Sequence, residues 1–116
     1  RQIPAFYFVG SRSLSVYHAR LRNRCSNLNS DLYQNHLRET SECICGYEEE
    51  NANHFFFHCT LYIVPRNVLF RSTRKFHPLN VRTLLFGNEL VSDSDNACIF
   101  KAVQRFIKDT KRFAQN

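Results

Sequence analysis

Apolar residues recur every three or four positions near the start of the chain, a spacing typical of an amphipathic helix. Over residues 11–24, Leu14, Tyr17 and Leu21 lie within about 80° on one side of such a helix, and Cys25 continues the register. We therefore predict a helix that buries this face, with Cys25 in the core.

The strongest helical pattern covers residues 94–113. Six residues share one arc of that helix: Phe100, Val103, Phe106, Ile107, Thr110 and Phe113. Ser94 or Asp95 can cap its start. We predict that this helix closes the core, and that Cys98 is also a core residue.

A short helix is predicted after the Asn-rich turn at residues 27–30, capped by Asn29 or Ser30 and ending near Leu37. Its predicted buried residues are Leu32, Tyr33 and Leu37.

Two more helices are predicted in the second half of the chain. Pro65 fits the first turn of a helix over residues 65–75, because a proline there loses no backbone hydrogen bond. Residues 80–86 predict another, which Gly87 would end.

The segment between these helices carries four candidate metal ligands within seventeen positions, namely Cys43, Cys45, His54 and Cys59. Structural zinc takes four thiolate or imidazole ligands in a tetrahedron, and Gly46 can take the positive φ that a metal-binding turn often needs. His58 is an alternative to His54, although it adjoins Cys59 and its side chain would diverge from that ligand. We predict a structural zinc site, with four protein ligands and no position open for a catalytic water.

The cysteine count favours metal over disulfides. The chain has five cysteines, an odd number, and Cys43 and Cys45 are too close in sequence to pair comfortably. We therefore expect reduced thiols and an intracellular location, nuclear or cytoplasmic. No apolar run reaches the roughly 18 residues that a membrane span needs, so no membrane is expected. The alternative to a zinc site is that these cysteines and His54 are ordinary buried residues.

The fold is predicted to be mainly α, with about four to five helices around a small zinc-bound β-hairpin or knuckle. At 116 residues, without internal repeats, the chain fits a single zinc-stabilised domain over residues 1–116. Because it begins with Arg1 rather than Met, we expect it to be a fragment of a longer polyprotein.

The net charge of +6 favours an acidic partner such as nucleic acid. Two basic patches are predicted, a stripe along the helix at residues 94–113 and a less ordered group near the start. The predicted nucleic-acid contacts are Arg20, Arg22, Arg24, Lys101, Arg105, Lys108 and Arg112. The alternative is that both patches are only solvated helix faces.

Several features follow one another in a distinctive order from about Leu14 onward. They are an arginine-bearing helix at 18–22, an Asn-rich turn at 25–32, Cys-x-Cys-Gly at 43–46, acidic residues at 48–50, His-Phe-Phe-Phe-x-Cys at 54–59, Tyr62, Arg66, and a basic aromatic tail at 103–113. This combination resembles the carboxyl-terminal zinc-binding (CCHC-type) region of non-LTR retrotransposon reverse transcriptases.

The resemblance implies an accessory domain without enzymatic activity, which helps position element RNA or target DNA for upstream reverse transcriptase domains. The chain itself has no Tyr-x-Asp-Asp polymerase motif. An alternative is a docking module with a purely structural zinc ion and no bound nucleic acid. A hydrolytic enzyme is disfavoured, because no pair of acidic residues has a persuasive catalytic spacing.

Overall fold

A computed structural model describes residues 3–114, and within this range the fold is mainly helical, as predicted. It contains no β-strand in these residues, so the predicted β-hairpin is not found there. The elements in chain order are η1 (Ala5–Phe8), α1 (Arg12–Arg22), α2 (Asn29–Gln34), α3 (Ala52–Phe57), η2 (Thr60–Tyr62), α4 (Ile63–Ser72), η3 (Arg74–Phe76), α5 (Val81–Phe86) and α6 (Asp93–Thr110).

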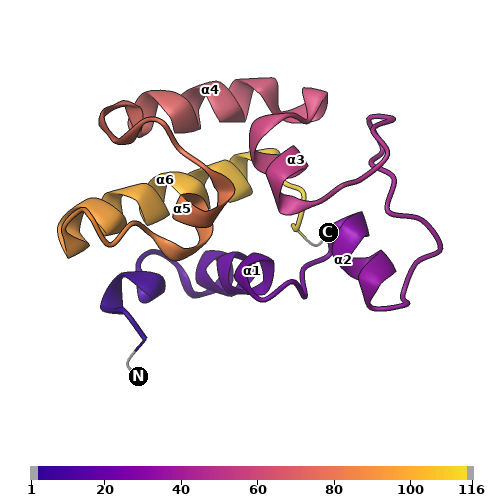
Figure 1. The fold of residues 1–116 in the computed structure, drawn as a ribbon, viewed down its shortest axis with the longest axis horizontal. Helices are drawn as coiled ribbons and strands as arrows, with labels where there is room; N and C mark the ends of the chain where they lie inside the picture. Colours follow the sequence, from indigo (N-terminus) through magenta and orange to yellow (C-terminus); the bar gives the residue numbers. More distant parts are fainter. Residues whose placement is uncertain (1–2, 115–116) are drawn as a thin grey trace.

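Helix α6 is the centre of the fold. Helices α1 and α4 pack on different sides of it, and α5 lies against both α1 and α6 (Figure 1). A long loop joins α2 to α3 at one end of the molecule (Figure 1). This loop carries the first two candidate metal ligands, and α3 with the residue pair that follows it carries the other two.

The predicted apolar arc of α6 forms the middle of the core. Phe100, Val103, Phe106 and Ile107 are all buried, as is Phe113 beyond the helix. Burying a side chain of this size contributes about 1.5–3 kcal/mol, so the arc is a large part of the stability. The core is therefore organised around the helix that the sequence pattern indicated most strongly.

The start of α6 differs from the prediction. Ser92 is the N-cap, and its hydroxyl accepts a hydrogen bond from the amide of Asp95 at 3.0 Å. The predicted caps, Ser94 and Asp95, lie inside the first turn, where Asp93 and Asp95 complement the helix dipole. The helix ends at Thr110, and the next residue, Lys111, is the C-cap and adopts the left-handed conformation.

Aromatic rings connect α3 to α6. Phe55 meets Phe106 edge to face, with ring centroids 5.1 Å apart, and also contacts Phe113 at 5.5 Å. Phe56 packs against Phe106 from the same short helix. The element that carries His54 is thereby fixed to the core.

Helix α2 does not bury the face that was predicted. Leu37 is 73% exposed and Tyr33 45% exposed, while the residues at the start of the helix, Leu28, Asn29 and Ser30, are buried. The helix packs by its amino-terminal end rather than along one side. Neither Asn29 nor Ser30 caps it, because Leu28 holds the N-cap position and makes no side-chain cap.

The predictions for the two remaining cysteines are wrong: Cys25 and Cys98 are both exposed. Helix α1 ends at Arg22, and the positive φ of Arg24 (57°) breaks the register that would have turned Cys25 inward. The buried polar residue of α1 is instead His18, whose Nε2 lies 2.7 Å from the carbonyl oxygen of Leu84 in α5. Burial lowers the pKa of His18 to about 4, so the ring is neutral at pH 7.

The two predicted helices of the second half are found with small shifts. Helix α4 begins at Ile63, so Pro65 lies in its first turn as expected. Helix α5 ends at Gly87, whose φ of 82° favours glycine and bears out the predicted stop.

A partly buried ion pair connects the loop between α2 and α3 to Arg112, just beyond α6. Glu50, 2% exposed, accepts two hydrogen bonds from Arg112, from Nε at 2.9 Å and from Nη2 at 2.8 Å. Its Oε1 also accepts the amide of Asn29 at 2.7 Å, while its backbone oxygen accepts the amide of Ser30 at 3.0 Å. Glu50 thus supplies the cap that α2 lacks.

Replacing Glu50 with glutamine should lower the free energy of unfolding by about 1.5–3 kcal/mol, the range for a hydrogen-bonded charged group. The loss arises because Arg112 keeps its charge but loses its carboxylate partner. Chemical denaturation of zinc-loaded protein measures it, with exposed Glu48→Gln as the matched control. Equal stability of the two variants would show that the ion pair is dispensable.

Candidate metal centre

The first two candidate ligands lie on a tight turn. The amide of Gly46 donates to the carbonyl oxygen of Cys43 at 2.9 Å, and the amide of Cys43 donates to the carbonyl oxygen of Tyr47 at 2.8 Å. Gly46 has a φ of 101°, the left-handed region expected for it. The turn brings Cys43 and Cys45 to one side, while Ile44 between them is exposed.

The other two ligands come from α3 and the residues just after it. Asn51 caps this helix, accepting the amide of His54 at 2.8 Å, and so fixes the turn on which His54 lies. The amide of Cys59 donates to the carbonyl oxygen of His54 at 2.8 Å. This bond folds the chain back at the end of the helix and places Cys59 beside His54.

All four candidate ligands converge. One ligand atom from each of Cys43, Cys45, His54 and Cys59 lies within 4.8 Å of the other three. His58, the alternative to His54, is exposed and is not part of this group.

Two of the six separations among these atoms match the edges of a zinc tetrahedron. With Zn–S near 2.3 Å and Zn–N near 2.0–2.1 Å, tetrahedral angles give S···S edges of about 3.8 Å and S···N edges of about 3.5 Å. The Sγ atoms of Cys43 and Cys59 are 3.8 Å apart, and Sγ of Cys45 is 3.4 Å from Nε2 of His54. The residues present can therefore hold one zinc ion through Nε2 and three thiolates.

The electrostatics of the cluster favour a bound cation. Burial raises the pKa of Cys43 to about 12 and also raises the pKa of Cys59, which disfavours two thiolates in this space. A hydrogen bond from the backbone of Tyr47 lowers the pKa of Cys45, and burial lowers the pKa of His54, so its imidazole is neutral, as a ligand must be. A divalent ion offsets the cost of gathering three thiolates.

The surroundings fix the orientation of the imidazole. The ring of Tyr47 stacks on His54, with centroids 4.5 Å apart and planes 6° from parallel. Nδ1 of His54 is buried without a hydrogen-bond partner among the described residues. The ring is thus held by packing, and Nε2 is the nitrogen that faces the thiols.

Buried Arg66 secures α3 from the other side. Its Nε donates to the carbonyl oxygen of Phe56 at 2.8 Å, and its Nη2 donates to that of Phe55 at 3.3 Å. These are carbonyls at the end of a helix, where a cation is favourable. Arg66 thereby links α4 to the helix that carries His54.

The predicted basic residues fall into two groups. Five of the seven are exposed: Arg20, Arg24, Lys101, Arg105 and Lys108. Arg22 donates to the carbonyl oxygen of Leu85 at 2.9 Å and lies over the ring of Tyr7. Arg112 lies beyond the end of α6 and pairs with Glu50, so the predicted four-residue stripe ends at Lys108.

The structural roles of three residues were not predicted from the sequence: those of Glu50, Arg66 and His18. Glu50 stands in an acidic run and its partner is 62 residues away, so no local pattern marks it. His18 was recognisable only as a polar residue near the apolar side of a helix. Helix α3 was also not predicted, although Asn51 before Ala52 is a typical N-cap and could have indicated its start.

We found no significant match to this chain among protein-family models, curated proteins or solved structures. The resemblance to retrotransposon reverse transcriptases therefore stays a prediction from the sequence.

Replacing Cys59 with serine should remove one zinc ligand and lower the thermal unfolding midpoint by more than about 10 °C. Metal binding energy is folding energy in such a site, and a loss of a few kcal/mol has roughly this effect in a domain of this size. Differential scanning calorimetry measures the shift. Cys98→Ser is the matched control, because Cys98 is exposed and lies outside the cluster. If the two variants melted alike, Cys59 would have no role in holding a metal.

Proposed function

We propose that the chain is a zinc-stabilised domain that binds nucleic acid and has no enzymatic activity of its own. The observation that supports the zinc assignment is the convergence of Cys43, Cys45, His54 and Cys59, with two edge lengths that match a zinc tetrahedron. Four protein ligands complete the coordination of structural zinc and leave no site for a catalytic water. Zinc in this position joins the long loop to α3.

Nucleic-acid binding is supported by the charge and by its placement. The net charge is +6, and the Glu50–Arg112 pair leaves it unchanged because it removes one charge of each sign. Lys101 and Lys108 on α6, Arg20 in the last turn of α1 and Arg24 just beyond it are exposed and form no ion pair with any described residue. Such cations bind phosphates with little sequence preference.

In a longer polyprotein, this domain would hold element RNA or target DNA for a reverse transcriptase located upstream. Support for this part of the proposal comes from the order of the sequence motifs, in particular Cys-x-Cys-Gly at 43–46 and His-Phe-Phe-Phe-x-Cys at 54–59.

A docking module is the second candidate, and one observation favours it. Leu61, Ile63 and Val64, at the junction of η2 and α4, are each more than half exposed. Adjacent apolar side chains on a surface are typical of a protein contact. In this alternative the domain packs against its neighbours in the polyprotein and its cations face solvent.

A membrane role has no support in the helices. None of those within residues 3–114 combines the length and apolar character that crossing a bilayer requires.

Zinc-loaded protein should bind labelled single-stranded RNA or DNA with an affinity that falls steeply with salt. For about four phosphate contacts, the affinity for a single strand should drop roughly 50-fold between 50 and 200 mM salt. Fluorescence anisotropy titrations measure this dependence. The absence of binding at 50 mM salt would reject the nucleic-acid proposal and leave the docking module.

A further inference from the structure

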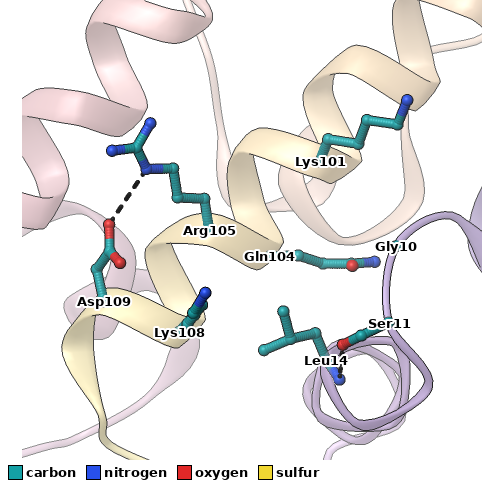
Figure 2. Close-up of a pocket in the computed structure, with 8 residues that line it drawn as sticks. All are labelled: Gly10, Ser11, Leu14, Lys101, Gln104, Arg105, Lys108 and Asp109. Atoms are coloured by element: carbon teal, nitrogen blue, oxygen red, sulfur yellow. Dashed lines mark hydrogen bonds and ion pairs between the residues drawn. The ribbon is translucent and has the colours of Figure 1, made fainter.

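A groove of about 440 Å³ runs between the start of α1 and the exposed side of α6. Figure 2 shows Lys101 and Lys108 on α6 and Gly10, Ser11 and Leu14 across from them, with Gln104 extending between the two sides. Arg105 and Asp109 also line the groove, and Arg105 is directed toward Asp109. The groove lies away from the four candidate zinc ligands, none of which lines it.

The wall formed by α6 is cationic. Lys101 and Lys108 are exposed and pair with no carboxylate among the described residues. Arg105 forms an ion pair with Asp109, with Nε 3.4 Å from Oδ2. The seven-residue step from Lys101 to Lys108 spans about 10 Å of helix. At the axial rise of about 3.4 Å per nucleotide of a B-form duplex, this length covers about three nucleotides of one strand.

The opposite wall is the amino-terminal end of α1, an eleven-residue helix. Ser11 caps it by accepting the amide of Leu14 at 3.2 Å, and its first turn holds no acidic residue. The free amides and the helix dipole therefore present positive potential to the groove. The carboxylate of Asp109 also lines the groove, where it pairs with Arg105. The two walls favour the same kind of ligand, an anion.

The floor of the groove shows an unmet hydrogen-bonding requirement. Gln104, 2% exposed, donates from Nε2 to the carbonyl oxygen of Val9 at 2.8 Å, which fixes the amide orientation. Its Oε1 then faces Gly10 and has no donor among the described residues. A buried acceptor without a donor costs free energy, and the bond from Nε2 to Val9 offsets part of this cost while it holds α6 against the turn before α1.

Gly10 is required at this position. Its φ is 80°, and a Cβ atom there would overlap the Gln104 amide oxygen. Glycine thus allows the chain to turn into α1 directly against α6. The groove owes its narrow floor to this close approach.

We propose that this groove is the phosphodiester-binding site of the domain, with Lys101 and Lys108 contacting separate phosphates of one strand and the start of α1 facing a phosphate of that strand. This inference rests on the proposed nucleic-acid binding and assigns it to one surface. A smaller hollow farther along the same two helices is lined by Arg20, Tyr17 and Phe113.

The test compares zinc-loaded wild type with two double variants that change the charge equally, using single-stranded RNA and DNA 20-mers of one sequence. Lys101→Glu/Lys108→Glu reverses the groove, and Arg71→Glu/Arg74→Glu reverses exposed charges outside it, on the side of α4. The groove variant should lose at least about tenfold in affinity at 50 mM salt. The slope of log K against log salt concentration should also become shallower by about 1.4, because two phosphate contacts are lost. The control variant should lose less than about threefold.

A single variant separates charge from folding. In Ser11→Asp, aspartate remains a good cap and suits the positive end of the helix, so the thermal midpoint should stay equal or rise. The added carboxylate at the groove should nevertheless lower the affinity for both strands by about threefold or more.

The outcomes distinguish this inference from the proposed function. If wild type binds and the groove variants bind as tightly as the control, the groove is not the site, although nucleic-acid binding stands. If wild type binds neither strand at 50 mM salt, the proposed function fails and the groove inference fails with it. Selective loss in the groove variants, for RNA, for DNA or for both, supports the assignment.

Discussion

The fold depends on bringing three thiols and an imidazole to one point. The loop between α2 and α3 contains no helix or strand of its own, so little besides its turns and the cluster determines its shape. Burial raises the pKa of Cys43 and of Cys59, which means that these thiols do not become thiolates readily by themselves. A zinc ion held by these four residues would remove that penalty, and its binding energy would then help to close the loop.

The closed loop contacts several other elements of the fold. The turn at Cys43–Gly46 places Glu50 where it can cap α2 and bind Arg112, so the loop holds the start of one helix and the end of another. On the other side, α3 carries His54 to the cluster and inserts Phe55 among the aromatic rings against α6. Metal, ion pair and aromatic core therefore support one another, and the basic surface of α6 is free for a separate role.

Much of this structure could be predicted from residue spacing. The apolar arc of α6 and the ligand set Cys43, Cys45, His54 and Cys59 are local patterns in the sequence. Structural zinc is bound mainly by cysteine and histidine, so a close group of these residues is recognisable. Helix α3 was missed because six residues are too few to show a period. The Glu50–Arg112 pair was missed because its partners lie far apart in sequence, and each alone resembles a solvated charge. The predicted stripe on α6 failed at Arg112 for the same reason: helical periodicity does not show where the helix ends.

The most direct test of the zinc assignment is X-ray absorption at the zinc edge on purified protein, combined with zinc content per chain. The account predicts one zinc per chain, three sulfur ligands near 2.3 Å and one nitrogen near 2.0–2.1 Å. A well-folded protein without metal would contradict it, and so would a zinc ion with fewer than three sulfur ligands.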